Sequence, residues 1–125
     1  MKPILLFLGI LLLLLAASAS AHHGYAAFDT SAKITLKGTV TDFYFVNPHC
    51  IIEFDVKDPN GQVQNWKAEL TSPNHLASRG WSESTIQAGE EISITGYRAK
   101  NGAPSIWVTK IRRANGQELS INAAN

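Results

Sequence analysis

Short runs of alternating apolar and polar residues, separated by turn-forming residues, constrain the fold of this chain more than any other feature. In the run 50–56, alternate residues put Cys50, Ile52, Phe54 and Val56 on one side of an extended strand. Turn sequences divide such runs at Asn47-Pro48, Asp58-Pro59-Asn60-Gly61, Asn101-Gly102 and Asn115-Gly116. The pattern therefore predicts an almost all-β domain.

Five strands are predicted, followed by a short tail strand that ends near Ile121. They run from Ile34 to the Asn47-Pro48 turn, then over 50–57, 62–70, 90–97 and 105–112. In the first strand the apolar alternation changes phase between Val40 and Phe43. We expect a β-bulge near Thr41-Asp42, or a bend at Gly38, to absorb this change.

One short helix is predicted between the third and fourth strands. Ser72 suits the N-cap, Pro73 the first helical position, and Gly80 the end. Three strands, a helix and two more strands are the element order of the OB-fold, a small five-stranded Greek-key barrel. The fold class is thus all-β with one short helix, a small OB-fold-like five-stranded barrel. A small β-sandwich remains the alternative.

The first 21 residues have the pattern of a secretion signal. Lys2 precedes an apolar run that begins at Ile4, and Ala19-Ser20-Ala21 fits the small-residue rule for cleavage. The apolar stretch 4–17 has 14 residues, fewer than the roughly 20 needed to span a bilayer. We therefore expect an exported protein, periplasmic or secreted, with no membrane span after cleavage.

Export divides the chain into four predicted parts. Residues 1–21 form the cleaved signal, 22–32 an N-terminal arm, 33–121 the barrel domain and 122–125 a tail. Loss of Lys2 changes 11 basic and 10 acidic residues to 10 of each, so net charge falls from +1 to zero. Nucleic acids are bound largely through phosphate neutralisation, so no nucleic-acid partner is expected.

Cys50 is the only cysteine, so no intramolecular disulfide is possible. Its strand face is apolar, which favours a small buried hydrophobic side chain over a metal ligand or an intermolecular bridge. Stability must then come from the core of the barrel.

The distinctive chemistry lies at the predicted mature N-terminus. Cleavage after Ala21 makes His22 the first residue, whose free amine and imidazole Nδ1 together form a chelate ring suited to copper(II). A second imidazole, from His23 or His49, would complete the site. The metal ligands predicted are thus His22, His23 and His49; cleavage after Ala19 would instead put Ser20 first and remove the chelate.

His49 also has other interpretations. It follows the Asn47-Pro48 turn and faces away from Cys50, on the side of Glu53 and Asp55. It either hydrogen-bonds to its own turn, which is the favoured interpretation, or joins the carboxylates in binding metal or transferring protons.

Two further interpretations concern residues that could hold the fold together. Arg79 is expected to pair with a carboxylate such as Glu69, fixing the helix to the barrel. The tryptophans and tyrosines are expected mainly in the core, although an OB-fold could also use them as a stacking surface. They are Trp66, Trp81, Trp107, Tyr44 and Tyr97.

No constellation typical of an enzyme is recognised. The chain lacks a Gly-x-Ser-x-Gly elbow and a phosphate-binding glycine loop. We therefore expect a binding module rather than an enzyme.

Several segments in order make the chain resemble a family of small exported bacterial proteins known only as a domain of unknown function. The resemblance covers nearly all of the mature chain and implies an exported small domain without implying an activity. The segments are His22-His23, Asn47-Pro48-His49, Trp66 with Glu69-Leu70, Ser72-Pro73-Asn74, Arg79-Gly80-Trp81 and Gly96 to Gly102.

The function expected is an exported binding module that holds copper(II) or a similar ion through the N-terminal histidine. The alternative is a domain that binds an envelope protein or a small ligand, in which the histidines have no role.

Overall fold

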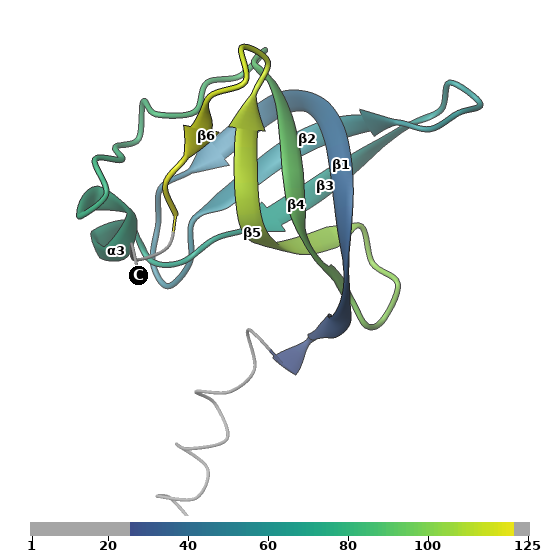
Figure 1. The fold of residues 1–125 in the computed structure, drawn as a ribbon, viewed down its shortest axis with the longest axis horizontal. Helices are drawn as coiled ribbons and strands as arrows, with labels where there is room; N and C mark the ends of the chain where they lie inside the picture. Colours follow the sequence, from purple (N-terminus) through teal and green to yellow (C-terminus); the bar gives the residue numbers. More distant parts are fainter. Residues whose placement is uncertain (1–25, 122–125) are drawn as a thin grey trace, which may run out of the picture.

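The computed structural model describes residues 26–121, which form six strands and the short helix α3 (Figure 1). The predicted signal peptide, His22, His23 and the tail 122–125 lie outside the described residues. The elements are β1 (Phe28–Tyr44), β2 (Ile51–Lys57), β3 (Val63–Glu69), α3 (Pro73–Ala77), β4 (Glu91–Ala99), β5 (Ser105–Arg113) and β6 (Glu118–Leu119).

The strands form one sheet in the order β3-β2-β1-β4-β5-β6, and β3 also pairs with β5. That last pairing is parallel, joins Lys67–Glu69 to Ser105–Trp107 and closes the first five strands into a barrel; we call it the closing pairing. A closed five-stranded barrel with a helix between β3 and β4 is an OB-fold, as predicted. The sandwich alternative is wrong because one continuous sheet closes on itself.

Strand β1 is 17 residues long and serves both halves of the barrel. Its earlier part pairs with β4 and its later part with β2, with a register shift between Val40 and Asp42. This confirms the bulge expected at Thr41. The strand starts at Phe28, earlier than predicted and within the segment assigned to an N-terminal arm.

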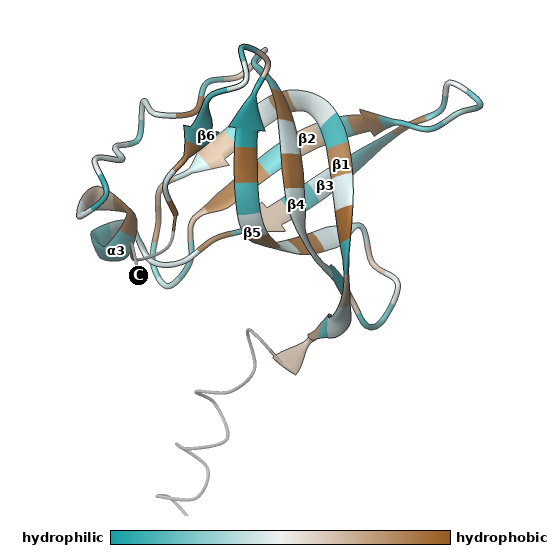
Figure 2. Ribbon diagram, in the orientation of Figure 1, coloured by the Kyte–Doolittle hydropathy of each residue, from teal (hydrophilic) through white to brown (hydrophobic). Residues whose placement is uncertain are grey.

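The core lies inside the barrel, where the apolar residues of each strand alternate with polar ones facing out (Figure 2). Cys50, Ile52 and Phe54 are fully buried, which confirms the alternation predicted for β2. Within residues 26–121 no polar or charged residue is buried. The barrel is therefore held by apolar packing and its backbone ladder.

Helix α3 has the cap that the sequence predicts. The Ser72 hydroxyl accepts a hydrogen bond from the backbone N–H of His75 at 3.3 Å, Pro73 is the first residue, and Leu76 is buried. Gly80 follows with a φ of +87°, a conformation that ends helices and that glycine adopts freely. Within residues 26–121, no helix has both the length and the apolarity to cross a membrane.

The segment that follows α3 is attached to the core at two points. Trp81 and Ile86 are buried, and Trp81 Nε1 donates to the carbonyl of Ser120 at 2.9 Å. Figure 1 shows α3 and the turn between β2 and β3 at opposite ends of the molecule. The two ends of the barrel are thus built differently.

Candidate functional site

His49 lies in the loop between β1 and β2, after a cis Asn47–Pro48 peptide bond. Backbone hydrogen bonds hold this loop against the segment that follows β3: Cys50 N–H donates to Thr71 O, and Leu70 N–H to Cys50 O. Because Cys50 faces the core, His49 lies on the outer face, next to the end of β3.

One hydrogen bond defines the chemistry of His49. Its Nδ1 lies 2.6 Å from Oε1 of Glu69, and both side chains are partly buried, at 32% and 25% exposure. An ionised carboxylate only accepts hydrogen bonds, so Nδ1 carries the proton. In the neutral imidazole Nε2 then holds the free lone pair, and it has no hydrogen-bond partner within residues 26–121.

Two aromatic rings complete the surroundings of His49. The edge of its ring contacts Trp107 at a centroid distance of 5.3 Å, and Trp107 contacts Phe28 at 5.8 Å. Glu69 and Trp107 are register partners in the closing pairing. Phe28, His49, Glu69 and Trp107 thus form one group, which we call the His49 cluster.

A shallow pocket of about 430 Å³ lies beside this cluster. Its lining includes Glu69 of the cluster, Ala27 and Phe28 at the start of β1, and Lys100 after β4. The start of the described chain, at Ala27 and Phe28, therefore lies next to Glu69, the partner of His49.

Other predicted partners of His49 are engaged elsewhere. Glu53 lies 3.8 Å from the Lys67 ammonium, and Asp55 accepts a hydrogen bond from Asn65 at 2.9 Å. The interpretation that His49 bonds to its own turn is wrong, because Nδ1 bonds to Glu69. Within residues 26–121, no three His, Cys, Asp or Glu side chains are grouped to hold a metal ion.

The predicted Arg79–Glu69 pair is also wrong. Glu69 binds His49, and the nearest polar partner of Arg79 is Nε2 of His75, 3.5 Å away in the same helical segment. The sequence indicated a carboxylate partner for Arg79 without indicating that Glu69, at the end of β3, lies against the loop before β2.

Cys50 is confirmed as a buried thiol with no exposed surface. Burial raises the pKa of the Cys50 thiol, an effect that a hydrogen bond from the Val46 backbone opposes. Cys50 is thus neutral and inaccessible, and it is a packing residue.

The aromatic residues divide between core and surface. Trp66 and Trp81 are buried as expected, Trp107 and Tyr97 are half-buried, and Tyr44 is 43% exposed. The expectation that these aromatic residues lie mainly in the core therefore holds for two of the five.

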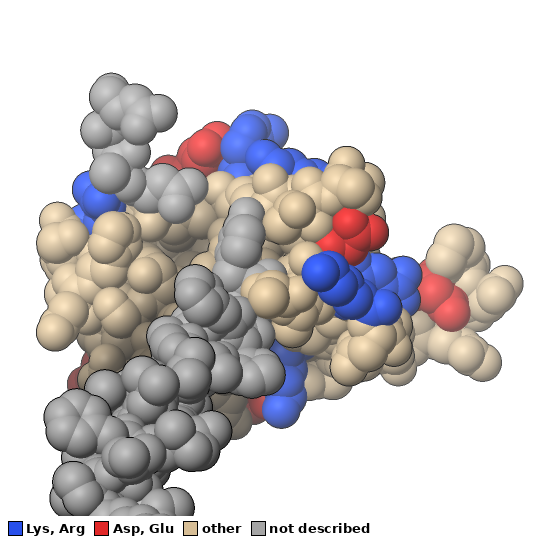
Figure 3. Space-filling model, turned by 90° about the horizontal axis from the view of Figure 1, so that it is seen from below, with Lys and Arg blue, Asp and Glu red and all other residues tan. Residues whose placement is uncertain are grey.

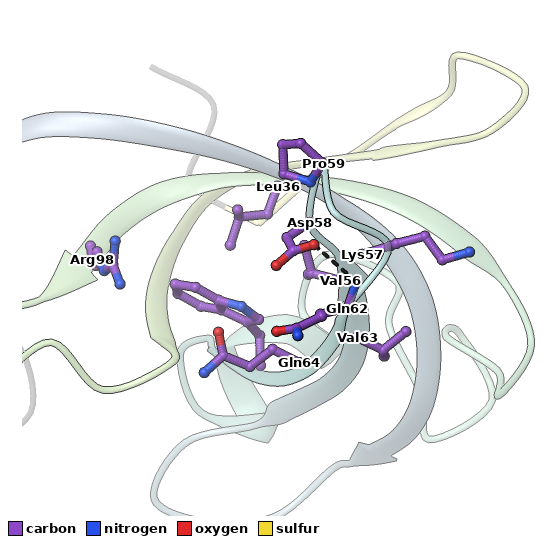
Figure 4. Close-up of a pocket in the computed structure, with 10 residues that line it drawn as sticks. Leu36, Val56, Lys57, Asp58, Pro59, Gln62, Val63, Gln64 and Arg98 are labelled. Carbon is purple, nitrogen blue, oxygen red and sulfur yellow. Dashed lines mark hydrogen bonds between the residues drawn. The ribbon is translucent and has the colours of Figure 1, made fainter.

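A second, larger pocket of about 630 Å³ lies at the mouth of the barrel beside the β2–β3 turn (Figure 4). Leu36, Val56 and Trp66 line it as apolar residues on the inner faces of β1, β2 and β3. Gln64 and Arg98 continue those inner rows from β3 and β4. The Arg98 guanidinium lies over the Trp66 ring, 5.3 Å from its centroid.

The sequence analysis missed this pocket. The alternation of side chains along the strands could have indicated it. On β4, Arg98 follows the inward-facing residues Ile92, Ile94 and Gly96. On β3, Gln64 faces the same side as the buried Trp66 and Ala68. Charged or amide side chains at inner positions mark the place where a barrel opens to solvent.

Charge is spread rather than concentrated on the face of the molecule shown in Figure 3. Figure 3 shows basic and acidic side chains interspersed on a largely uncharged face. Ion pairs such as Arg113–Glu90, at 3.3 Å, and Arg112–Glu118, at 3.8 Å, combine the two signs locally.

Comparison with known proteins gives a family match. Residues 11–106 match a family of unknown function, DUF6152, in agreement with the resemblance to a domain of unknown function. A comparison with curated proteins finds no match.

Two solved structures share part of the fold at low identity. One is a ZRD-deleted mutant of TiaS in complex with agmatine, with 18% identity, a TM-score of 0.49, and coverage of 78% of this chain and 24% of that one. This chain thus spans about a quarter of that TiaS chain. The other is the mitochondrial single-stranded DNA binding protein Rim1 from S. cerevisiae, with 11% identity, a TM-score of 0.49, and coverage of 66% and 94%.

Proposed function

We propose that this protein, which belongs to the DUF6152 family of unknown function, is an exported module that binds copper(II). The ligands are the amine and Nδ1 of His22, exposed by signal cleavage after Ala21, and Nε2 of His49. The imidazole of His23 is the alternative to His49 as the further ligand.

The hydrogen bond from His49 Nδ1 to Glu69 is the observation that carries this proposal. Metal-binding histidines usually donate their other ring N–H to a carboxylate, which fixes the tautomer and makes the ligand nitrogen more basic. The contact between His49 Nδ1 and Glu69 gives His49 this arrangement, and its Nε2 has no partner within residues 26–121.

The position of β1 supports a ligand from the N-terminal side. Phe28 contacts the same Trp107 ring as His49 does, and His22 precedes Phe28 by six residues. At most about 3.6 Å per residue, six residues reach roughly 22 Å, which is ample to return to His49. Two imidazoles and an amine form a nitrogen-rich set, which copper(II) prefers among the first-row divalent ions.

The first experiment establishes the mature N-terminus of the exported protein by intact mass and N-terminal sequencing. A start at His22 is required. A start at Ser20, or retention of the signal, would remove the chelate and contradict the proposal.

The second experiment titrates that protein with copper(II) and records the EPR spectrum. We expect one equivalent bound with nitrogen hyperfine structure, lost in His22→Ala and in a form that carries Met before His22. His49→Ala should change the spectrum and weaken binding. His75→Ala is the matched control, because His75 is exposed on α3 and is distant in sequence from the proposed ligands.

Equal copper binding by wild type, His22→Ala and His49→Ala would overturn the proposal. If only His49→Ala is without effect, the further ligand is His23 and the role assigned to His49 is wrong.

A further inference from the structure

The pocket at the barrel mouth carries an inference independent of the histidines. It lies beside the β2–β3 turn and is lined by Trp66 and Arg98, whereas the pocket beside the His49 cluster is lined by Phe28 and Glu69. Its volume of about 630 Å³ lies in the range of roughly 300–1,000 Å³ typical of small-molecule sites.

Three side chains that line this pocket have hydrogen-bonding groups without partners in the described part of the chain. Within residues 26–121, no hydrogen bond or ion pair engages the guanidinium of Arg98 or the carboxamides of Gln62 and Gln64. Arg98 is nonetheless held in place, because its guanidinium lies over the Trp66 ring. A guanidinium held by its face keeps its N–H edge available for a planar oxyanion.

The other charged groups at the pocket favour a single negative charge. Asp58 lines the pocket, and its carboxylate accepts the backbone N–H groups of Asn60 and Gln62, at 2.8 and 2.9 Å. Figure 4 shows the side chain of Lys57 pointing away from the pocket. One free cation beside a fixed carboxylate suits a monoanion better than a phosphate dianion.

The rest of the lining is apolar. Leu36 and Val56 are half-buried at the floor of the pocket. Covering these surfaces is favourable in proportion to the apolar area that leaves water. The ligand should therefore carry a short apolar body behind its charged group.

We propose that this pocket binds a small organic carboxylate. The carboxylate accepts hydrogen bonds from the Arg98 guanidinium, the Gln62 and Gln64 carboxamides bind its remaining lone pairs or an adjacent polar group, and the apolar body lies on Leu36 and Val56.

The test compares hexanoate with hexanamide and with inorganic phosphate, following backbone amide shifts in two-dimensional NMR spectra of isotope-labelled protein. Hexanoate should give saturable shifts at Gln64, Arg98 and the β2–β3 turn. Hexanamide should bind at least about tenfold more weakly than hexanoate, because it lacks the charge. Phosphate should give no shifts at these residues. Equal shifts with acid and amide, stronger shifts with phosphate, or no saturable shift with hexanoate would overturn the proposal.

Variants assign the roles of the side chains. Arg98→Gln should weaken hexanoate binding about tenfold or more, and Arg98→Lys should weaken it less, since an ammonium keeps the charge without the paired N–H groups. Arg112→Gln is the matched control, because Arg112 is exposed on β5 and pairs with Glu118. Hexanoate binding by Arg98→Gln as tight as by wild type would contradict the proposal.

A second variant covers the case in which loss of Arg98 disturbs the barrel. Gln64→Leu alters an exposed position, so the fold should persist, and it should weaken hexanoate binding because a hydrogen-bond donor to the carboxylate is lost. Unchanged hexanoate binding would contradict the role assigned to Gln64. His49→Ala should leave hexanoate binding intact, so the outcome is separate from that of the copper experiments.

Discussion

Glu69 provides the most direct residue-scale test of the proposed role of His49 as a copper ligand. Replacement by glutamine keeps the size of the side chain and removes the charge that holds the proton on Nδ1. We expect Glu69→Gln to weaken copper binding about 10- to 100-fold, the usual effect of losing such a partner. Isothermal titration calorimetry with copper(II) measures the change in affinity.

Glu53→Gln is the control for this prediction. Glu53 is a half-buried carboxylate on the outer face that pairs with Lys67 and does not contact His49. Similar losses in the two variants would mean that charge in general, and not the Glu69 hydrogen bond, governs copper binding.

A second residue-scale prediction concerns Cys50. Burial favours its neutral thiol, so the pKa of Cys50 lies above the ordinary value of 9.0. The neutral thiol therefore stabilises the fold fully below that value, and the stabilisation is lost as pH rises through the raised pKa. At mildly alkaline pH the native protein should react with a thiol reagent far more slowly than the urea-unfolded protein.

With an aromatic disulfide as the thiol reagent, the absorbance of the aromatic thiolate that it releases follows the reaction. Native and unfolded protein reacting at the same rate would show that Cys50 is accessible, contrary to its complete burial.

Residue-scale prediction from sequence succeeded where the information was local. The burial of Cys50 and the cap at Ser72 follow from neighbours within a few positions. The partner of His49 is 20 residues away, at Glu69, and depends on how the loop before β2 lies against the end of β3. Alternation gave the outward direction of His49 and could not give its partner.

At the scale of elements, Gly96 on β4 is the most constrained position. A β-carbon there would lie 1.9 Å from the backbone carbonyl oxygen of Trp107, where β4 and β5 change register. Neither backbone can move away without breaking the ladder, so Gly96→Ala should destabilise the protein by about 3 kcal/mol. Urea denaturation measures the change in free energy of unfolding.

Glu91→Ala on the same strand is the control, because it is exposed and should change stability by no more than about 0.5 kcal/mol. A fully stable Gly96→Ala variant would mean that the two strands can separate locally at little cost.

The elements also show what periodicity can predict. Alternation and turn residues located β2 to β5 and the bulge in β1 because strands and turns are encoded by neighbouring residues. The first part of β1 escaped prediction because residues 28–33 do not alternate and are held by pairing with β4, about 65 residues later. The pocket lined by Trp66 and Arg98 was not predicted, because the sequence analysis did not identify the end at which the barrel opens to solvent.

At the scale of the whole molecule, charge leads us to expect no single-stranded nucleic acid as a partner. The chain carries 11 basic and 10 acidic residues, and the two signs are interspersed on the face shown in Figure 3. Binding through phosphates requires a basic surface. We therefore expect no binding of a fluorescent single-stranded oligonucleotide at low salt, measured by anisotropy; saturable binding that weakens with salt would refute this expectation.

The closing pairing affects the order in which the hairpins and the surroundings of His49 form during folding. It joins residues nearly forty positions apart over three register pairs, and it alone brings Glu69 beside Trp107. Contacts between distant segments carry a loop-closure cost that hairpins avoid, and they limit the folding rate. A nascent chain that has formed its hairpins thus still lacks the surroundings of His49, so we expect the proposed copper site to form only once the barrel has closed.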